Sequence, residues 1–338
     1  MSCTAIAQEA VFGFGREKQS DLVTGNLIAE ILRLSTINAV PIIPAFTTED
    51  DSDESGNGHD FPSNNFAVSK ALTMDFEAYL TSYKMAWLSA FCLGATVKTG
   101  AGPFTYTSTP LDRAVDGCEL PAFSILQQVR GTDVLDQLLI GNVVNSFQVE
   151  IASGPGRASS RVTANILGIG KVTDPSTLTM PALTAESLLS SASLALSANG
   201  VDYVATKRIK SLTWGFNNNV DSARMFFPGS GLDGGFAIGG RMEVDKREAS
   251  LSFVADFDDT QDEITKLIAQ TEGTAVISQS FSASEEYTAT FHRITFGEIT
   301  ANRDGNRIEV AVTCKPLYDS VNGILTVAAD TAIDNIAA

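Results

Sequence analysis

The sequence predicts a mainly β fold made of two related antiparallel β-sandwich or barrel domains, each with one flanking α-helix. Three observations lead to this prediction. Most of the chain alternates apolar and polar residues with a period of two, which is typical of half-buried strands. Two stretches have the spacing and the end residues of helices. These two stretches also match each other without a gap, which indicates an internal duplication.

The first half begins with a strand candidate near residues 27 to 37. It leads into the polar run "TTEDDSDESGNGHDFPSNN" at residues 47 to 65 and then into a strand at residues 66 to 78. Further along, "SFQVEIA" at 146 to 152 and "RVTANIL" at 161 to 167 alternate cleanly. Each is expected to bury one face against a core and to show the other to solvent.

The second half repeats this order. A strand at residues 207 to 218, containing "SLTWGFN", leads to a second long loop, "VDSARMFFPGSGLDGGFAIGG", at residues 220 to 240. A strand at residues 245 to 257 follows, with "ASLSFVADF" at its end. "RIEVAVTCK" at residues 307 to 315 is a later strand of the same kind.

Each predicted helix directly follows a strand. The first is "LTSYKMAWLSAFCLG" and the second is "TQDEITKLIAQTEG". Their start and stop signals are N-cap side chains, a capping box and glycines after the last turn. The residues in these positions are Thr81 or Ser82 and Gly94 in the first helix, and Thr260 with Glu263 and Gly273 in the second.

The matched register predicts that residues 66 to 97 and 245 to 276 superpose as one strand and helix unit. Leu72 and Leu251 lie 179 positions apart (251 − 72 = 179). Three strands are expected after each helix. The predicted domains are residues 1–172 and 201–338, joined by a linker and leading hairpin at residues 173–200. The same offset pairs Thr81 with Thr260, Leu88 with Leu267, Ala90 with Ala269, Gly94 with Gly273 and Val97 with Val276.

The composition is that of an acidic globular protein. Lys and Arg number 23 against 40 Asp and Glu, which gives a formal net charge of −17. This balance argues against a groove that grips nucleic acid, because phosphate binding needs clustered cations. The start "MSCTAIAQEAVFGFG" lacks the features of a signal peptide, and no stretch has the length of a membrane helix. We therefore expect synthesis in a cytoplasm and no membrane partner.

No constellation of side chains predicts catalysis, a cofactor or a metal. His59 and His292 are the only histidines, and neither has a second histidine at ligand spacing. The cysteines lack C-x-x-C spacing, so free thiols are expected at all of them. They are Cys3, Cys92, Cys118 and Cys314.

Three weaker motifs have structural explanations. The acidic run imitates the first half of a calcium loop, but Pro62 stands where a closing glutamate is needed. "GSGLDGG" fits G-x-G-x-x-G without the strand and helix that a dinucleotide site requires. Asp258 and Asp259 suit a helix N-terminus, and Glu285 and Glu286 are adjacent on a strand and so point to opposite faces.

The apolar run "RMFF" lies inside the second predicted loop. Loops rarely expose such side chains unless these fold back onto the core or are buried in another chain. Both alternatives stay open for Met225, Phe226 and Phe227.

Several stretches resemble the tail tube proteins of long-tailed bacteriophages. In the second half these are "SASLALSANGVDYVATKRIKSLTWGFNNNVD" and "GRMEVDKREASLSFVADFDDTQDEITKLI". In the first half "SGNGHDFPSNNFAVSKALTMDFEA" and "LPAFSILQQVRG" resemble the corresponding parts of one group of these proteins. The resemblance covers about residues 60 to 318 and rests on the order and pattern of elements.

The resemblance implies a structural protein of the virion tail rather than an enzyme. Copies assemble into rings whose inner strands close a barrel, and stacked rings form the tube through which genome DNA passes without specific binding. The implied partners are further copies of the chain and the tape-measure, terminator and baseplate proteins, with no cofactor. A duplicated chain implies three-chain pseudo-sixfold rings, with six-chain rings as the alternative. Another tail or baseplate component, or a soluble carbohydrate-active or binding protein, are the other functions considered.

In this family long loops reach the next ring, so both long loops are candidate contacts between rings or subunits. The first offers acids that would meet basic groups such as Arg157 or Arg161 on a neighbour, and the second offers apolar anchors. The candidate assembly residues are Glu49, Asp50, Asp51, Asp53, Glu54, Asp60, Met225, Phe226 and Phe227.

Overall fold

The computed structural model describes residues 10–17, 31–37, 40–50, 65–112, 120–129, 132–152, 160–173, 178–183, 187–203, 209–221, 245–257, 262–304, 307–334 and 336. Within these residues the protein is mainly β with two α-helices, which confirms the predicted fold class. The first-half elements are β1 Ala10–Glu17, β2 Leu32–Leu34, β3 Ala45–Asp50, β4 Asn65–Tyr79, α1 Ser82–Leu93, β5 Gly94–Thr99, β6 Phe104–Pro110, β7 Ala122–Val129, β8 Thr132–Ala152 and β9 Arg161–Thr173. The later elements are the 3-10 helix η3 Ser191–Ser193, β10 Ala195–Ala198, β11 Val201–Asp202, β12 Ile209–Asn217, β13 Glu248–Asp256, α2 Asp262–Ala269, β14 Gly273–Ser282, β15 Glu285–Asp304, β16 Arg307–Pro316 and β17 Leu325–Thr331.

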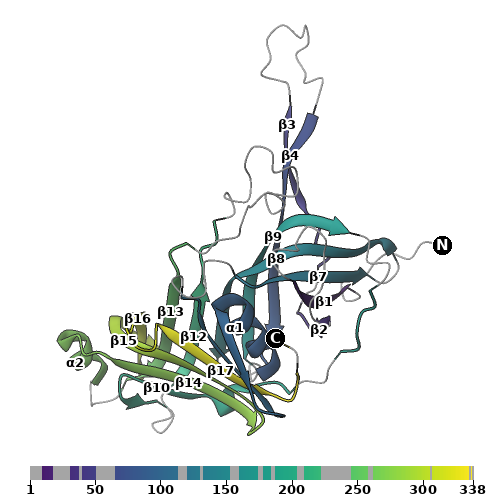
Figure 1. Cartoon of the computed structure of the whole chain (residues 1–338). Coiled ribbons are helices and arrows are strands. Elements are labelled where there is room, and N and C mark those ends of the chain that lie inside the picture. Colours follow the sequence, from purple (N-terminus) through teal and green to yellow (C-terminus); the bar gives the residue numbers. More distant parts are fainter. Residues whose placement is uncertain are drawn as a thin grey trace, which may run out of the picture.

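The strands form two connected antiparallel walls. The long wall runs in the order β3-β4-β9-β8-β12-β13-β16-β15, so strands of both halves lie side by side. The first part of β8 also pairs with β7, which joins β1 and β2 to this wall. β15 continues into the second wall, in the order β5-β6-β17-β15-β14-β10. Figure 1 shows α1 near the centre of the molecule, and it contacts strands of both walls.

The helix α1 is buried at every position from Ser82 to Leu93. α1 is therefore a core helix, whereas the sequence predicted a helix that flanks the sheet. A helix that is buried on all sides needs partners all round it, and the two walls supply them. Trp87 packs against Phe14, Phe91 and Phe123, with ring centroids 4.9, 4.8 and 5.1 Å away, respectively.

The predicted ends of the helices are confirmed for α1 and partly wrong for α2. Thr81 Oγ1 accepts a hydrogen bond from the Lys84 N–H at 3.1 Å, and Gly94 caps the last turn with φ 96°. α2 ends earlier, at Ala269, because Gln270 takes the left-handed conformation with φ 48°. Gly273 begins β14 instead of ending the helix.

The predicted capping box at α2 lies partly outside the described residues, because Thr260 does. Glu263 is buried, and its Oε1 accepts a hydrogen bond from the Tyr203 hydroxyl at 3.1 Å. This bond ties α2 to the chain segment that follows β11.

The two halves share one hydrophobic core. β12 of the second half pairs with β8 of the first over residues 211–217 and 146–152. Trp214 of β12 is fully buried and meets the Phe147 ring edge-on at 5.4 Å. Leu189, in the predicted linker, is also buried, and its N–H donates to Leu80 O at 3.0 Å. Neither half therefore packs without the other.

Two predictions about strands are wrong. Five strands, β5 to β9, follow α1 and four, β14 to β17, follow α2, where three were expected after each helix. The strand expected near residues 27 to 37 is only the short β2, which pairs with β1, while residues 27 to 30 lie outside the described part. The start of the acidic run instead belongs to β3, which pairs with β4.

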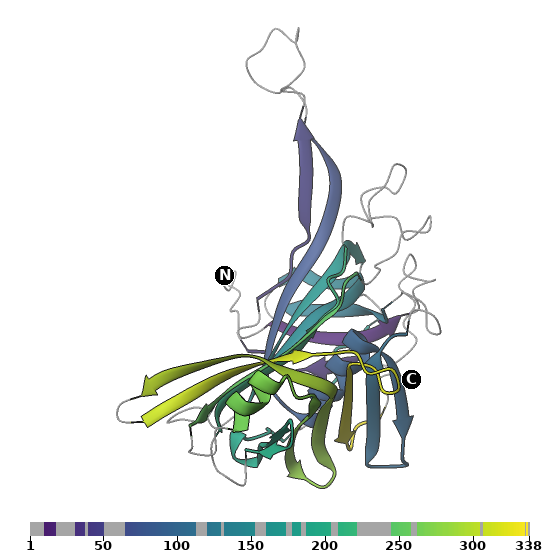
Figure 2. The ribbon, with the colours of Figure 1, turned by 90° about the vertical axis from the view of Figure 1, so that its left-hand side faces the viewer.

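Two hairpins project from the body, as Figure 2 shows. The β3–β4 hairpin rises as a finger, and every residue of β3 is exposed. The β15–β16 hairpin extends sideways, and residues 297–304 of β15 are exposed except for the half-buried Ile299. These hairpins are the parts of the described chain that reach farthest beyond the shared core.

The shared core predicts one cooperative unfolding transition. Phe147→Leu and Trp214→Phe should each lower the stability by about 1–3 kcal/mol, and their effects should couple by about 0.5–1.5 kcal/mol because they remove one common contact. Urea unfolding followed by circular dichroism and tryptophan fluorescence measures both quantities. Phe281→Leu, at an exposed position, is the control. Two separate transitions, or strictly additive losses, would contradict a shared core.

Candidate functional site

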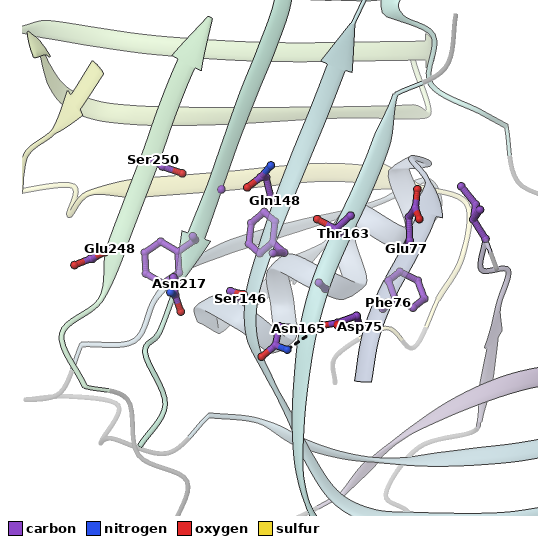
Figure 3. Close-up of a pocket in the computed structure, with 15 residues that line it drawn as sticks. Asp75, Phe76, Glu77, Ser146, Gln148, Thr163, Asn165, Asn217, Glu248 and Ser250 are labelled. Carbon is purple, nitrogen blue, oxygen red and sulfur yellow. Dashed lines mark hydrogen bonds between the residues drawn. The ribbon is translucent and has the colours of Figure 1, made fainter. Parts of the chain in front are cut away.

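A polar groove crosses the face of the long wall. Its lining comes mainly from β4, β9, β8, β12 and β13, and its volume is about 630 Å³. The sequence analysis did not predict this groove. The only indication in the sequence is the polar character of the residues that alternate with the buried ones along these strands. Figure 3 labels ten lining residues: Asp75, Phe76, Glu77, Ser146, Gln148, Thr163, Asn165, Asn217, Glu248 and Ser250.

Strand alternation separates this face from the core. On β8, Phe147 and Val149 are buried while Gln148 and Glu150 are exposed. Gly215 of β12 sits where β8 comes close, and an added Cβ would lie 2.5 Å from the Phe147 carbonyl oxygen. A larger residue at Gly215 would push the two strands apart, so this glycine keeps the wall continuous across the two halves.

The groove face and its extension onto β16 and β15 are rich in carboxylates. Arg161 Nη1 lies 2.9 Å from Glu77 Oε1, so this candidate partner for the acidic loop is already bound within the protomer. Lys210 Nζ lies 3.0 Å from Asp304 Oδ2 and 3.5 Å from Asp256 Oδ1. The carboxylates on this face outnumber its cations, which include Arg307 and Lys315 of β16, so the face is negative. The further carboxylates on it are Asp75, Glu150, Glu248 and Glu309.

The predicted assembly residues are only partly described. Glu49 and Asp50 end β3 and are exposed at the outer end of the described part of the β3–β4 finger, opposite Phe66 and Asn65. The structure thus places these two acids at the far end of a projecting hairpin. The other candidates lie outside the described residues: Asp51, Asp53, Glu54, Asp60, Met225, Phe226 and Phe227.

The base of the second long loop is held by buried asparagine contacts. Asn218 Nδ2 donates to the Cys92 carbonyl oxygen at 2.8 Å, at the end of α1. The Asn218 N–H donates to Asn145 O at 2.9 Å, and its own carbonyl accepts from the Asp245 N–H at 3.1 Å. Asn145 Oδ1 in turn accepts from the Val220 N–H at 2.9 Å. Both ends of the loop therefore leave from one fixed point.

The histidine and cysteine positions match structural roles. His292 Nε2 lies 2.7 Å from Thr326 Oγ1, and partial burial holds the pKa of this imidazole below its usual value. Cys92 and Cys314 are buried free thiols, as expected. Burial raises the pKa of both thiols, that of Cys314 to about 12, which keeps them protonated and unreactive.

The remaining motif residues add no reactive cluster to the described part. His59, Cys3 and Cys118, the calcium-like run, the glycine motif and Asp258 with Asp259 lie outside the described residues. Glu285 and Glu286 open β15 in a hairpin with β14. Within the described chain no group of three or more His, Cys, Asp or Glu is placed to hold a metal ion. None of the described helices is long and apolar enough to cross a membrane.

A polar sheet face, projecting hairpins and a main core shared by both halves define the class of this protein as a mainly β protein with a large continuous sheet. The sequence comparison identifies which structural family this is. The chain belongs to the phage tail tube protein family, because the model of that family matches residues 2–316. This confirms the resemblance found in the sequence and places the protein among structural components of the virion tail. No curated protein matches the sequence.

The asparagine contacts at the loop base predict a measurable loss of stability. Asn218→Ala removes the bond to the Cys92 carbonyl and leaves that buried acceptor without this donor, which should cost about 1–3 kcal/mol. Urea unfolding measures the change. The matched control is Asn302→Ala on exposed β15, expected within about 0.5 kcal/mol of the unsubstituted protein. Equal effects of both substitutions would argue against a structural role for Asn218.

Proposed function

We propose that the protein polymerises into stacked rings that form a phage tail tube, and that the genome DNA passes through its lumen. The observation that carries this proposal is the polar, carboxylate-rich face of the long wall, in a chain that belongs to the tail tube family. In the assembled tube this face lines the lumen, and the core with α1 lies on the outer side of the wall.

A negative lumen suits passage rather than binding. DNA phosphates and the carboxylates of this face repel one another, and Arg161 and Lys210 are held by acids instead of being available to phosphates. The lumen would therefore keep the duplex away from its wall. A formal net charge of −17 is therefore compatible with a protein whose lumen DNA passes.

We further propose that each chain carries two equivalent units, residues 1–172 and 201–338, so that three chains make a pseudo-sixfold ring. The sheet neighbours support this equivalence. When β4 is aligned with β13 at the offset of 179 (251 − 72 = 179), their antiparallel partners β9 and β16 align at a second constant offset of 146 (314 − 168 = 310 − 164 = 146). Leu72 pairs with Gly168 and Leu251 with Cys314, while Phe76 pairs with Ala164 and Ala255 with Val310.

The two long loops are proposed as contacts between rings or subunits. Glu49 and Asp50, at the end of a projecting finger, are positioned to meet another chain. The fixed base at Asn218 presents the second loop from a rigid point. The proposed partners are further copies of this chain and the tape-measure, terminator and baseplate proteins of the same phage. Synthesis takes place in the cytoplasm of the bacterial host.

Negative-stain electron microscopy of the purified protein tests the proposal. Long filaments with a regular axial repeat and a central channel are expected. Discrete rings that do not stack would favour another tail or baseplate component, and turnover of a carbohydrate by protein that forms no filaments would favour a soluble enzyme. Reconstruction with threefold and sixfold symmetry imposed separately decides the ring, because six identical full-length chains would contradict the three-chain arrangement.

Charge reversal on the groove face should convert the lumen from repelling to retaining DNA. We expect Asp75→Lys with Glu248→Lys to leave assembly intact but to give tubes that bind a labelled short duplex. Affinity should fall steeply with salt, with a log–log slope of about −0.9 for each phosphate that the new lysines neutralise. Fluorescence anisotropy at several salt concentrations measures this slope. Asp202→Lys on β11, away from the groove, is the control. DNA binding that is equal in both variants would argue against this face as the lumen.

The apolar run of the second loop should be needed for polymerisation. Phe226→Ser with Phe227→Ser is expected to leave the subunit folded and to block tube formation, since apolar burial lost at a repeated contact is multiplied along the tube. Circular dichroism checks the fold, and sedimentation with microscopy measures the tubes. Phe281→Ser, at an exposed β14 position, is the matched control. Full-length tubes of normal stability from the double variant would remove the second loop from the assembly contacts.

A further inference from the structure

We propose that residues 43–47 of one copy pair as an antiparallel strand with residues 300–304 of β15 in a neighbouring copy. This rests on the proposed ring assembly and names the two edges that meet within a ring. The pairing reproduces, between two copies, the contact that β12 and β8 already make inside each chain.

The contact between β8 and β12 serves as the template. β12 lies between β13 on one side and β8 on the other, so both of its edges are paired. Phe216 of β12 stands opposite Ala249 of β13 and Phe147 of β8, and only 2% of it is exposed. Strands of both halves therefore form one continuous wall at this point.

The segment before the β3–β4 finger occupies the position of β12 in the first half. Phe46 pairs with Lys70 as Phe216 pairs with Ala249, and Lys70 and Ala249 are related by the duplication offset (249 − 70 = 179). Burial follows the same pattern. Ile42 and Pro44 are buried, as are the matching Leu212 and Trp214 of β12 (212 − 42 = 214 − 44 = 170).

Unlike β12, this segment has no described strand paired with its outer edge, although the Gln127 side chain binds the backbone of Ile42. Phe46 is 58% exposed, whereas its counterpart Phe216 is 2% exposed. Val40 and Ile43 are also largely exposed. Among the strands that the structure describes, only β4 pairs with β3. The exposed Phe46 therefore lies where Phe216 of β12 has β8 as its neighbour.

Residues 300–304 of β15 are the counterpart of residues 146–150, in the part of β8 that pairs with β12 (301 − 147 = 154). Across the first half a row of opposite residues runs from Phe76 through Ala164 and Phe147 to Phe216. The matching row starts at Ala255 and runs through Val310 to Ala301. There it ends, because none of the described strands pairs with the edge of these residues that faces away from β16.

The outer edge of residues 43–47 and the edge of residues 300–304 that faces away from β16 are expected to pair with each other between two copies. The first row places Phe216 next to Phe147, so the second row places Phe46 of a neighbouring copy next to Ala301. Placing Phe46 opposite Ala301 fixes the register of the whole antiparallel pair, because the two residue numbers of every opposite pair then sum to 347 (46 + 301 = 347). The expected opposite pairs are Thr47 with Thr300, Phe46 with Ala301, Ala45 with Asn302, Pro44 with Arg303 and Ile43 with Asp304.

The proposed ladder is short for physical reasons. Pro44 has no N–H group to donate, so it removes one possible bond. Upstream, the side chain of Gln127 already holds Ile42, whose N–H donates to Gln127 Oε1 at 2.6 Å. The pairing is therefore limited to about five residues, and burial of Phe46 supplies much of its specificity.

Disulfide trapping tests this pairing. Phe46→Cys and Ala301→Cys are placed in one chain in which Cys3 and Cys118 are replaced by serine, while the buried Cys92 and Cys314 are kept. Directly opposite residues bring their Cβ atoms within reach of a disulfide. Treatment of assembled protein with diamide should give covalent oligomers on a non-reducing gel, ending at the trimer if the ring holds three chains. Phe281→Cys with Ala301→Cys is the matched control and should stay monomeric.

A second variant measures the contribution of the contact. Phe46→Ser should reduce the yield of tubes by at least about tenfold at a fixed protein concentration, while Phe281→Ser should not. Normal tubes that give no Phe46→Cys and Ala301→Cys cross-link, or that cross-link equally in the control pair, would overturn the pairing and leave the tube function standing. Cross-linked rings from a protein that never stacks into tubes would support the pairing and contradict the proposed function.

Discussion

The antiparallel contact between β8 and β12 is the constraint on which the rest of the structure depends. It joins the two halves of the chain into one wall and brings Trp214 against Phe147 in a common core. The contact is close because Gly215 has no side chain to hold the strands apart. With the wall continuous, its core-facing side can enclose α1, and the residues on its opposite side form one polar face instead of two separate surfaces.

The buried helix and the loop base follow from the same contact. α1 is buried at every position, so it needs cover on every side and contacts both walls at once. Just beyond the end of β12, Asn218 binds the last turn of α1 and the backbone of β8. The second long loop therefore starts and ends at the place where the wall, the helix and the two halves meet. Substitutions within this loop should therefore affect the core little, because the hydrogen bonds of Asn218 hold the loop base in place.

Local sequence patterns correctly predicted strand faces and helix ends, which depend on neighbouring residues. They missed the features of the fold that depend on contacts between residues far apart in the sequence. Alternation correctly indicated that Phe147, Val149 and Trp214 face a core, and Thr81 and Gly94 were found as ends of α1 because caps are local. β1 was not predicted. Its partner β7 lies more than 100 residues away in the sequence, so no pattern near β1 indicates this pairing. The groove face was also missed. Its acids come from β4 and β13, and only the register across strands brings them together.

An exposed sheet edge is a hazard as well as an opportunity, because it offers unpaired backbone groups to any passing strand. The two incomplete edges of this chain carry the features that restrain such pairing. Pro41 and Pro44 interrupt the donors of one edge, and charged residues such as Glu298 and Asp304 lie along the other. General strand addition is thereby disfavoured, while a partner that buries Phe46 in the correct register gains what β12 gains from β8. An intact wall inside each chain would then set the geometry for the proposed contact between chains.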